Sequence, residues 1–248
     1  MDALSMAAAS GMKAKIESLE MLANNIANQG SPGYKADREF YSLYIAPEAL
    51  EAADASLVQL PTTAPVIERH WTDFTQGTLT ETGNPLHLAM SGRGFFTVAG
   101  PQGPLYTRAG AFRLSAAGRL ETQERFAVLS ADGAPIDLNP TQSVEVSQAG
   151  EIRQNGNVVA QMGLVDFEQP ERLSKHAGTY FQMSVPDAAR RQTSGEVLQG
   201  RLEASNQAPA EAAVRLVTVM RQFEMLQRAL VISGEMNRRV DDVARVGN

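Results

Sequence analysis

The N-terminal end of the chain carries a helical pattern of hydrophobic positions. Over residues 2–28, apolar or small side chains recur in steps of three and four, a spacing that keeps them on one face of an α-helix. The pattern stops at Asn28-Gln29-Gly30-Ser31-Pro32-Gly33, where glycine can adopt the left-handed cap conformation and proline cannot continue a helix. The sequence therefore predicts an amphipathic helix whose stripe consists of Leu4, Ala8, Ala9, Met12, Ile16, Leu19, Leu22, Ala23 and Ile26.

The C-terminal end carries a second, longer stripe. We expect this helix to begin near Asn206, a residue type that caps helices, with Pro209 in its first turn and Glu211 near the positive end of the helix dipole. Ser233 and Gly234 interrupt the stripe, which favours bundle packing or a bend over an ideal two-stranded coiled coil. The apolar positions are Leu216, Met220, Phe223, Leu226, Leu230, Met236, Val240 and Val243.

Between the helices the pattern changes to short runs with a period of two. Turn-forming residues separate these runs, and Asn155-Gly156 is the strongest hairpin signal among them. Strands this short and closely spaced predict an antiparallel sandwich or folded ribbon that ends near 178–185, before a polar stretch over 186–195. The candidate strands are Leu86–Met90, Phe95–Ala99, Leu105–Arg108, Phe112–Leu114, Phe126–Ser130, Val144–Ser147, Glu151–Arg153 and Val158–Asp166.

The predicted fold class is mainly β with long terminal α-helices. A central antiparallel β-domain over 71–195 is flanked by an N-terminal assembly helix over 1–33 and a C-terminal assembly helix over 196–248, and we expect the helices to pair in a bundle. Residues 34–70 contain three prolines and an Ala/Glu-rich patch that could form a short helix near 48–54. We therefore expect this segment to be an extended linker.

Three explanations of the two stripes remain open. The helices join neighbouring subunits, they pack on each other or on the β-domain within one monomer, or they lie on a membrane surface. The stripes together are too long for a β-domain of about 130 residues to cover, and uncovered apolar surface marks a partner site. A membrane-surface helix favours Lys or Arg on its polar face and Trp or Phe on its apolar face, and the N-terminal helix has neither bias. The pattern therefore favours an assembly protein.

The composition excludes several classes of function. The net charge is −6, so the chain lacks the positive charge typical of nucleic-acid binding. No apolar run is long enough for a transmembrane helix, which predicts no stable membrane insertion. The N-terminus lacks the basic and apolar regions of a cleaved secretory signal. The absence of cysteine excludes disulfides, thiol catalysis and Cys-ligated zinc.

Candidate catalytic chemistry is sparse. His70, His87 and His176 are scattered, without the spacing of metal ligands. Gly92-Arg93-Gly94 precedes a predicted strand and not a helix N-terminus, which favours a tight turn over a phosphate loop. Four carboxylates that could form a hydrolytic pair are spread over predicted turns. We therefore predict no enzyme, no cofactor and no catalytic or metal-binding residues; the carboxylates are Glu121, Glu124, Asp132 and Asp137.

Four sequence blocks resemble those of the flagellar basal-body rod and hook proteins, in the same order and over nearly the whole chain. Any one block is a weak signal, but four in register are highly specific. The blocks are Leu22-Ala23-Asn24-Asn25-Ile26-Ala27-Asn28 with Ser31-Pro32-Gly33-Tyr34-Lys35; Gly83-Asn84-Pro85-Leu86-His87-Leu88-Ala89-Met90 with Gly92-Arg93-Gly94-Phe95-Phe96-Thr97-Val98; Leu105-Tyr106-Thr107-Arg108-Ala109-Gly110-Ala111-Phe112 with Gly118-Arg119-Leu120; and Gln199-Gly200-Arg201-Leu202-Glu203-Ala204-Ser205-Asn206 with Arg221-Gln222-Phe223-Glu224.

The resemblance implies a structural role in the bacterial flagellum. Such proteins are exported unfolded through the flagellar type III apparatus without a cleaved signal. They stack into the rod that crosses the periplasm and transmits motor torque, with the paired terminal helices forming the inner tube. The implied partners are other rod subunits, copies of the chain itself and the export apparatus. The chain length and the Arg-x-Phe-Glu form at 221–224 favour the proximal-rod subunit over the longer distal-rod subunit.

We expect the assembly interface to be built from both helices. The Asn24-Asn25-Ile26-Ala27-Asn28 run either sets the register between subunits or makes hydrogen bonds that close the turn at Gly30, and both explanations stay open. The expected interface residues are Met12, Ile16, Leu19, Leu22, Asn24, Asn25, Ile26, Asn28, Leu216, Met220, Phe223, Leu226, Leu230 and Val240.

Some positions depart from the pattern of the family. His87 stands where relatives usually have Asp, Glu124-Arg125 stands where a glycine turn is expected, and Ala208-Pro209-Ala210 replaces a Val-rich start of the last helix. Two rival functions also remain: an accessory protein of rod and hook assembly, and a β-rich binding module or enzyme with helical appendages.

Overall fold

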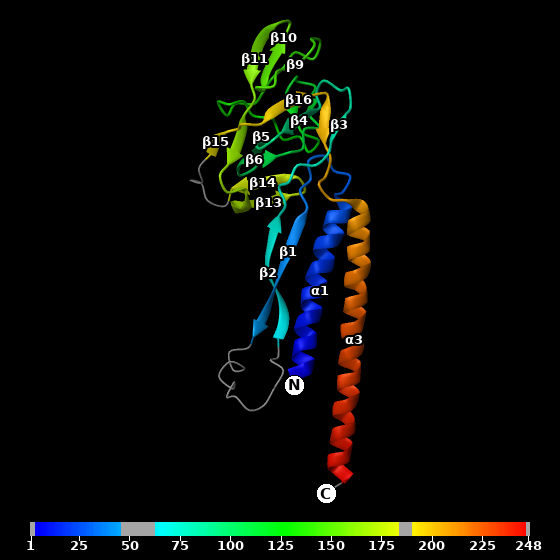
Figure 1. The fold of residues 1–248 in the computed structure, drawn as a ribbon. Coiled ribbons are helices and arrows are strands. Elements are labelled where there is room, and N and C mark those ends of the chain that lie inside the picture. The colour runs from blue at the N-terminus through cyan, green and yellow to red at the C-terminus, as the bar shows by residue number, and fades with distance from the viewer. Residues whose placement is uncertain (1–2, 46–62, 184–189, 247–248) are drawn as a thin grey trace. The chain divides into compact units, whose positions relative to one another are not determined.

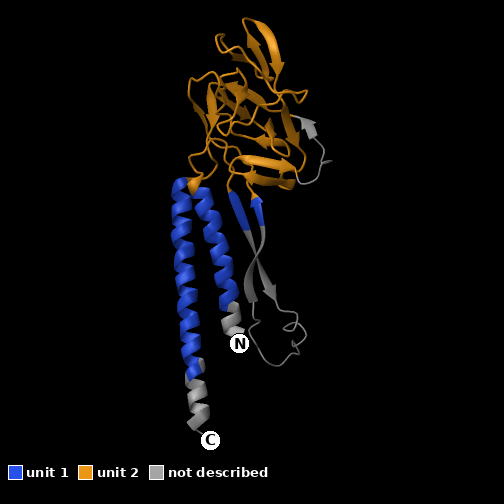
Figure 2. Cartoon of the chain, turned by 180° about the vertical axis from the view of Figure 1, so that it is seen from behind, with its two compact units in different colours: residues 1–26, 37–71, 209–248 blue, residues 27–36, 72–208 orange. Residues whose placement is uncertain are grey.

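The computed structural model describes residues 3–45, 63–183 and 190–246. The chain forms two compact units (Figure 2). Unit 1 comprises residues 1–26, 37–71 and 209–248, and unit 2 comprises residues 27–36 and 72–208. The described part is mainly β, with antiparallel sheets and a long helix near each end, which confirms the predicted class of elements; the predicted bundle is shown only in part.

Unit 1 contains two long helices and a two-stranded sheet (Figure 1). Helix α1 (Ala3–Ala27) and helix α3 (Pro209–Val246) run side by side in opposite directions, and β1 (Asp37–Ile45) pairs with β2 (Thr63–Thr72). The helical periodicity at both ends of the sequence therefore forms helices, as predicted.

Helix α1 ends where the glycine and proline cluster predicts. The amide of Ser31 donates to the carbonyl of Asn28 at 2.9 Å, and Gly33 has a positive φ of 69°. A Cβ atom at Gly33 would lie 2.3 Å from the carbonyl carbon of Arg108. Glycine is thus required there for the conformation and for the close approach of two backbone segments.

Unit 2 is built around a six-stranded antiparallel sheet. Its strand order is β13-β14-β6-β5-β12-β15, formed by β5 (Phe95–Gly100), β6 (Gly103–Thr107), β12 (Leu164–Phe167), β13 (Leu173–Ala177), β14 (Tyr180–Met183) and β15 (Arg190–Gln192). A short 3₁₀ turn, η1 (Pro170–Arg172), precedes β13. Smaller ladders complete the unit: β9 (Glu145–Val146), β10 (Glu151–Gln154) and β11 (Asn157–Gln161) in one sheet, and the pairs β4 (Leu88–Ser91) with β16 (Glu196–Gln199), β3 (Leu79–Glu81) with β17 (Arg201–Glu203), and β7 (Arg113–Leu114) with β8 (Leu120–Glu121).

Both faces of the six-stranded sheet are covered by apolar side chains. Because successive strand residues point to opposite faces, Phe95 and Phe96 enter different cores. Phe96 belongs to the larger cluster, where it packs edge-on against Phe112 with ring centroids 5.3 Å apart. Phe95 belongs to a smaller aromatic cluster with Tyr106 and Phe167. The strands of unit 2 therefore pack on two sides, although the alternation in the sequence predicts only that a sheet forms.

The structure confirms the Asn155-Gly156 hairpin. Both residues have positive φ, 50° and 80°, which is the conformation of the tight turns that join antiparallel strands. The turn connects β10 to β11, and Gln154 pairs with Asn157.

The single strand predicted over Val158–Asp166 is wrong. The chain instead forms β11, which pairs with β10, and then β12, which pairs with β5 and β15. Gly163 lies at the break, where a Cβ atom would meet the carbonyl oxygens of Leu129 and Ser130 at 2.9 Å. The close approach of two backbones explains how the chain changes sheets here. The predicted strand over Phe126–Ser130 likewise forms only isolated bridges.

The predicted boundaries at 34–70 and at 196 also differ from the structure. The supposed linker begins with Tyr34, Lys35 and Ala36 buried in unit 2, and it then contains β1 and most of β2. The short helix considered near 48–54 lies outside the described residues. The segment 196–248 begins with β16 and β17, and α3 starts only at Pro209. Strands with few apolar residues, such as β15 and β17, do not show a period of two clearly enough to be recognised.

Candidate assembly surface

The two helices of unit 1 contact each other through a small apolar cluster. Met21 and Leu22 of α1 are buried together with Val219 of α3, and Leu19 and Leu216 pack at the edge of the cluster. Packing within one monomer was one of the three explanations of the stripes, and the structure supports it for this part of both helices.

Polar contacts connect the helices to β1. The Glu39 carboxylate has 1% of its side-chain surface exposed and accepts hydrogen bonds from Ser18 Oγ at 2.6 Å and Arg215 Nη2 at 2.7 Å. The buried Asn25 side chain donates to the Asp37 carbonyl at 2.8 Å and accepts from the Asp37 amide at 3.0 Å. The side chain of Asn25 therefore bonds to the start of β1. This contact corresponds to neither of the two explanations offered for the asparagine run.

A second row of apolar side chains lies on the other side of α3. Val214, Met225, Ile232 and Met236 are separated by eleven, seven and four residues, and at 3.6 residues per turn these separations place them on one side of the helix. Their exposed fractions range from 57% to 69%. By the same periodicity, Val219 lies about 100–140° around the helix from these four residues, and it packs against Met21 and Leu22 of α1. Helix α3 is thus apolar on two sides, and α1 covers only one of them.

An apolar hollow lies close to this row within unit 1. It has a volume of about 660 Å³. Its lining combines the predicted interface residues Met12 and Leu230 with side chains from the exposed part of α3, and it consists of Met12, Gln227, Arg228, Leu230, Val231 and Ile232.

The predicted interface residues divide by exposure. Leu22 and Asn25 are buried inside the chain, whereas Ile16, Asn24 and Met220 are exposed. Asn28 belongs to unit 2, and the side chain of Val240 lies outside the described residues. The half-buried remainder is Met12, Leu19, Ile26, Asn28, Leu216, Phe223, Leu226 and Leu230.

The sequence stripe missed most of the exposed row. Val214, Met225 and Ile232 lie off the steps of three and four that connect Leu216 to Leu230. A signal was present, since a helix with apolar residues on two sides has more of them than one stripe needs.

Unit 2 contains a buried charge cluster in which three of the family-like blocks meet. Lys35 Nζ lies 2.6 Å from Glu203 Oε1, and Arg108 Nη1 lies 3.3 Å from Glu203 Oε2. The side chain of Glu203 is 0% exposed and that of Lys35 is 1% exposed. Burial lowers the pKa of the Lys35 ammonium, and the adjacent Glu203 carboxylate opposes that shift. Sequence reasoning quoted these residues in motifs but assigned them no role.

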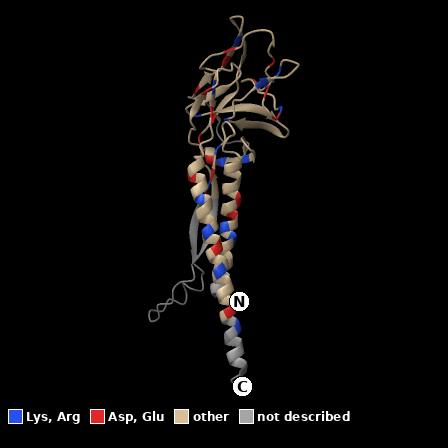
Figure 3. Ribbon diagram, turned by 90° about the vertical axis from the view of Figure 1, so that its right-hand side faces the viewer, with Lys and Arg blue, Asp and Glu red and all other residues tan. Residues whose placement is uncertain are grey.

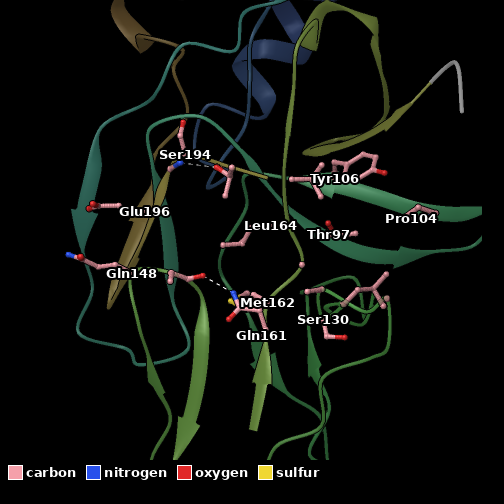
Figure 4. Close-up of a pocket in the computed structure, with 18 residues that line it drawn as sticks. Thr97, Pro104, Tyr106, Ser130, Gln148, Gln161, Met162, Leu164, Ser194 and Glu196 are labelled. Carbon is pink, nitrogen blue, oxygen red and sulfur yellow. Dashed lines mark hydrogen bonds between the residues drawn. The ribbon is translucent and has the colours of Figure 1, made fainter. Parts of the chain in front are cut away.

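A cavity in unit 2 does not have the lining of a hydrolytic site (Figure 4). Its volume is about 990 Å³, and Glu196 is the one carboxylate among its lining residues, which include no histidine, lysine or arginine. Gln161 Nε2 donates to the carbonyl of Ala149 at 2.7 Å, so part of the polar lining is used inside the protein. A carboxylate pair or a base beside a nucleophile is what acid–base or nucleophilic catalysis needs, and this cavity supplies neither.

The described residues provide neither a metal site nor a membrane-spanning helix. No group of three or more His, Cys, Asp or Glu side chains is placed to hold a metal ion. None of the described helices combines the length and the apolar character needed to cross a membrane.

The chain matches two family models. Residues 89–160 match the flagellar hook protein FlgE/F/G D1 domain, and residues 198–243 match the flagellar basal body rod FlgEFG protein C-terminal region. The first match covers much of the β-region of unit 2, and the second covers β17 and most of α3.

Curated relatives align over most of the chain. A flagellar basal-body rod protein FlgF from Caulobacter vibrioides is 30% identical over 92% of this chain and 91% of its own length. A flagellar basal-body rod protein FlgG from Agrobacterium fabrum is 31% identical over 92% of this chain and 94% of its own length. A FlgF from Rhizobium meliloti is 31% identical over 83% of both chains. Together with the fold and the buried cluster of family-like motifs, these matches show that the chain belongs to the flagellar basal-body rod proteins, which are structural subunits of the flagellum and not enzymes.

Proposed function

We propose that the chain is a proximal-rod subunit that assembles with copies of itself and with neighbouring rod subunits through the α1–α3 pair, and that it transmits motor torque through these contacts. The apolar row on the exposed side of α3, which α1 does not cover, is the observation that carries the proposal. Length and the Arg-x-Phe-Glu form at 221–224 support the proximal position. Resemblance to the family supports export through the flagellar type III apparatus without a cleaved signal.

The chemistry of the helices fits a protein partner better than a lipid surface. Positive and negative side chains are mixed along both helices of unit 1 (Figure 3). A membrane-surface helix would concentrate Lys and Arg on its polar face. Mixed charge beside an apolar row is typical of helices that pack against other helices.

The size of the row suits assembly that depends on concentration. Burying these four side chains at about 50 Å² each would contribute roughly 5 kcal/mol at about 25 cal/mol per Å². Association itself costs about 4–15 kcal/mol in lost freedom of motion. Contacts through this row alone would thus leave subunits monomeric when dilute, and assembly would proceed where a growing rod supplies several contacts together.

A double substitution in the exposed row tests the proposal. Met225→Asp with Ile232→Asp places charge on the row without touching the Leu22–Val219 contact. We expect normal circular dichroism of the purified chain, no incorporation into basal bodies and loss of motility. The matched control is Met225→Leu with Ile232→Leu, which keeps the apolar surface and should assemble normally. Normal rods with the aspartate variant would exclude this surface as the assembly interface. Loss of rods in both variants would mean that the substitutions act by disrupting the helix and not by changing its apolar surface.

A further inference from the structure

The chain passes between the two units four times, after residues 26, 36, 71 and 208. Three of these passages leave unit 2 from segments that lie side by side within it. The segments contain Gly33–Ala36, Asp73–Thr75 and Glu203–Asn206, and each is bonded to the others. The spacing of these exit points is therefore a property of unit 2 itself.

One side chain connects all three segments. Asn206 Oδ1 accepts a hydrogen bond from the Ala36 amide at 2.8 Å, and Asn206 Nδ2 donates to the Asp73 carbonyl at 2.7 Å. The Asp73 amide in turn donates to the Ala36 carbonyl at 2.9 Å. An asparagine suits this position because its amide group offers a donor and an acceptor on one short, nearly planar group. Helix α3 begins only at Pro209, so Asn206 is not the N-cap that the sequence predicts.

The buried charge cluster forms a second set of hydrogen bonds between the same three segments. Glu203 Oε1 accepts from Lys35 Nζ at 2.6 Å and from the Gly77 amide at 2.9 Å, and the Glu203 carbonyl accepts from the Gly33 amide at 2.7 Å. Lys35 Nζ also donates to the Thr75 carbonyl at 2.6 Å. Charge-assisted hydrogen bonds between buried groups are strong and strict in geometry. The three segments are therefore held by more than backbone pairing.

We propose that Asn206, Lys35 and Glu203 form a junction clamp that fixes the positions at which the chain leaves unit 2 toward β1, β2 and α3, and that assembly depends on it. None of the three belongs to the exposed apolar row of α3. Asn206 is thus a positioning residue. It acts on assembly through the segments it holds, and not through contact with a neighbouring subunit. The inference rests on the proposed function, because it assumes that the α1–α3 pair is what assembles.

Hydrogen exchange of the full chain tests the clamp directly. Asn206→Asp keeps the acceptor for the Ala36 amide and removes the donor to Asp73, and Asn206→Ala removes both. Losing a hydrogen bond of ordinary strength corresponds to roughly fivefold faster local exchange. We expect at least about that increase at the Ala36 and Asp73 amides in Asn206→Ala, a smaller one in Asn206→Asp, and unchanged exchange in β5 and β6. The control is Asn139→Ala, because Asn139 is exposed and its side chain accepts hydrogen bonds only from the nearby Thr141 in the described structure.

Incorporation into basal bodies separates positioning from stability. We expect the Asn206 variants to incorporate at least about tenfold less than the wild type. A core variant of unit 2, Ile136→Val, should lower thermal stability without changing incorporation. If the Asn206 variants exchange faster but assemble normally, or if Ile136→Val loses assembly equally, the clamp is wrong while the proposed function stands. If Met225→Asp with Ile232→Asp assembles normally, the proposed function fails separately.

Discussion

At the scale of single residues, Glu203 is the most fully buried charged residue of the described structure. Its carboxylate is fully buried between Lys35 and Arg108. Glu203→Gln would leave two cations without their counter-charge in a site closed to water, and breaking a buried ion pair costs about 3–5 kcal/mol. We expect a loss of that size in the free energy of unfolding, measured by denaturant titration followed by the circular dichroism of the β-strands. Asp137→Asn, which breaks the exposed pair with Arg119, should cost less than about 1 kcal/mol. Equal losses in the two variants would contradict the account.

The backbone conformation of Arg125 gives one departure from the family pattern a cost in stability. It has a positive φ of 68° in a turn where the resemblance to the family leads us to expect glycine, and its amide donates to the Thr122 carbonyl at 3.0 Å. A non-glycine residue in this conformation costs about 1–2 kcal/mol, part of which is offset by the greater freedom of glycine in the unfolded chain. Arg125→Gly should therefore stabilise the protein by about 0.5–1 kcal/mol in thermal unfolding. A lower stability than wild type would show that the Arg125 side chain makes a stabilising contact.

The ionisation of the Tyr180 hydroxyl makes the stability of the fold depend on pH in the alkaline range. Burial raises the pKa of the Tyr180 hydroxyl well above its usual range, and its hydrogen bond to Glu124 adds to the shift. The folded protein therefore keeps this proton where the unfolded chain, with a tyrosine pKa of about 10, releases it. Since the folded state then binds more protons, stability falls as pH rises above about 10. Tyr180→Phe should show a shallower fall between about pH 9 and about pH 11. Parallel curves for the two proteins would contradict the assignment.

The sequence pattern cannot reveal ion pairs between residues that are far apart in the chain. Lys35 and Glu203 are separated by 168 residues, and no periodicity relates them. Their presence in blocks that resemble one family marks both as important but does not say that they meet. The positive φ at Asn155 and Gly156 was predictable because a tight hairpin imposes it locally.

At the scale of elements, the helix pair of unit 1 should depend on its small apolar cluster. Leu22 is 2% exposed, and Leu22→Ala would remove a buried side chain at a cost of about 2–5 kcal/mol. We expect faster hydrogen exchange in α1 and in α3 around Val219, with unchanged exchange in the six-stranded sheet. Ile16→Ala is the matched control because Ile16 is 44% exposed. Equal effects of the two substitutions would show that the cluster does not hold the pair.

The elements were predicted unevenly for physical reasons. Both helices have long periodic patterns, and the N-terminal one also has a clear stop signal, so both were found. The strand over Val158–Asp166 was joined wrongly because Val, Leu and Met continue through the point where Gly163 lets the chain change sheets. β1 and β2 were missed because tertiary contacts, such as that of Glu39 with Ser18 and Arg215, hold them, and local alternation does not mark them.

At the scale of the whole molecule, the chain separates two physical roles. Unit 2 has its own cores on both faces of a sheet and carries the buried charges. Unit 1 leaves an apolar row of α3 exposed, which a chain evolved to remain a monomer would be expected to cover. Membership of the rod family and this uncovered row together indicate a subunit completed by its neighbours.

The most direct test of the central claim is electron microscopy of basal bodies from a host strain that lacks the gene, with a tagged copy restored. The account predicts that the deletion strain has no rod beyond its base, that the restored strain has complete rods, and that the tag is recovered in the rod. Intact rods and normal filaments in the deletion strain would contradict a structural role for this chain in the rod.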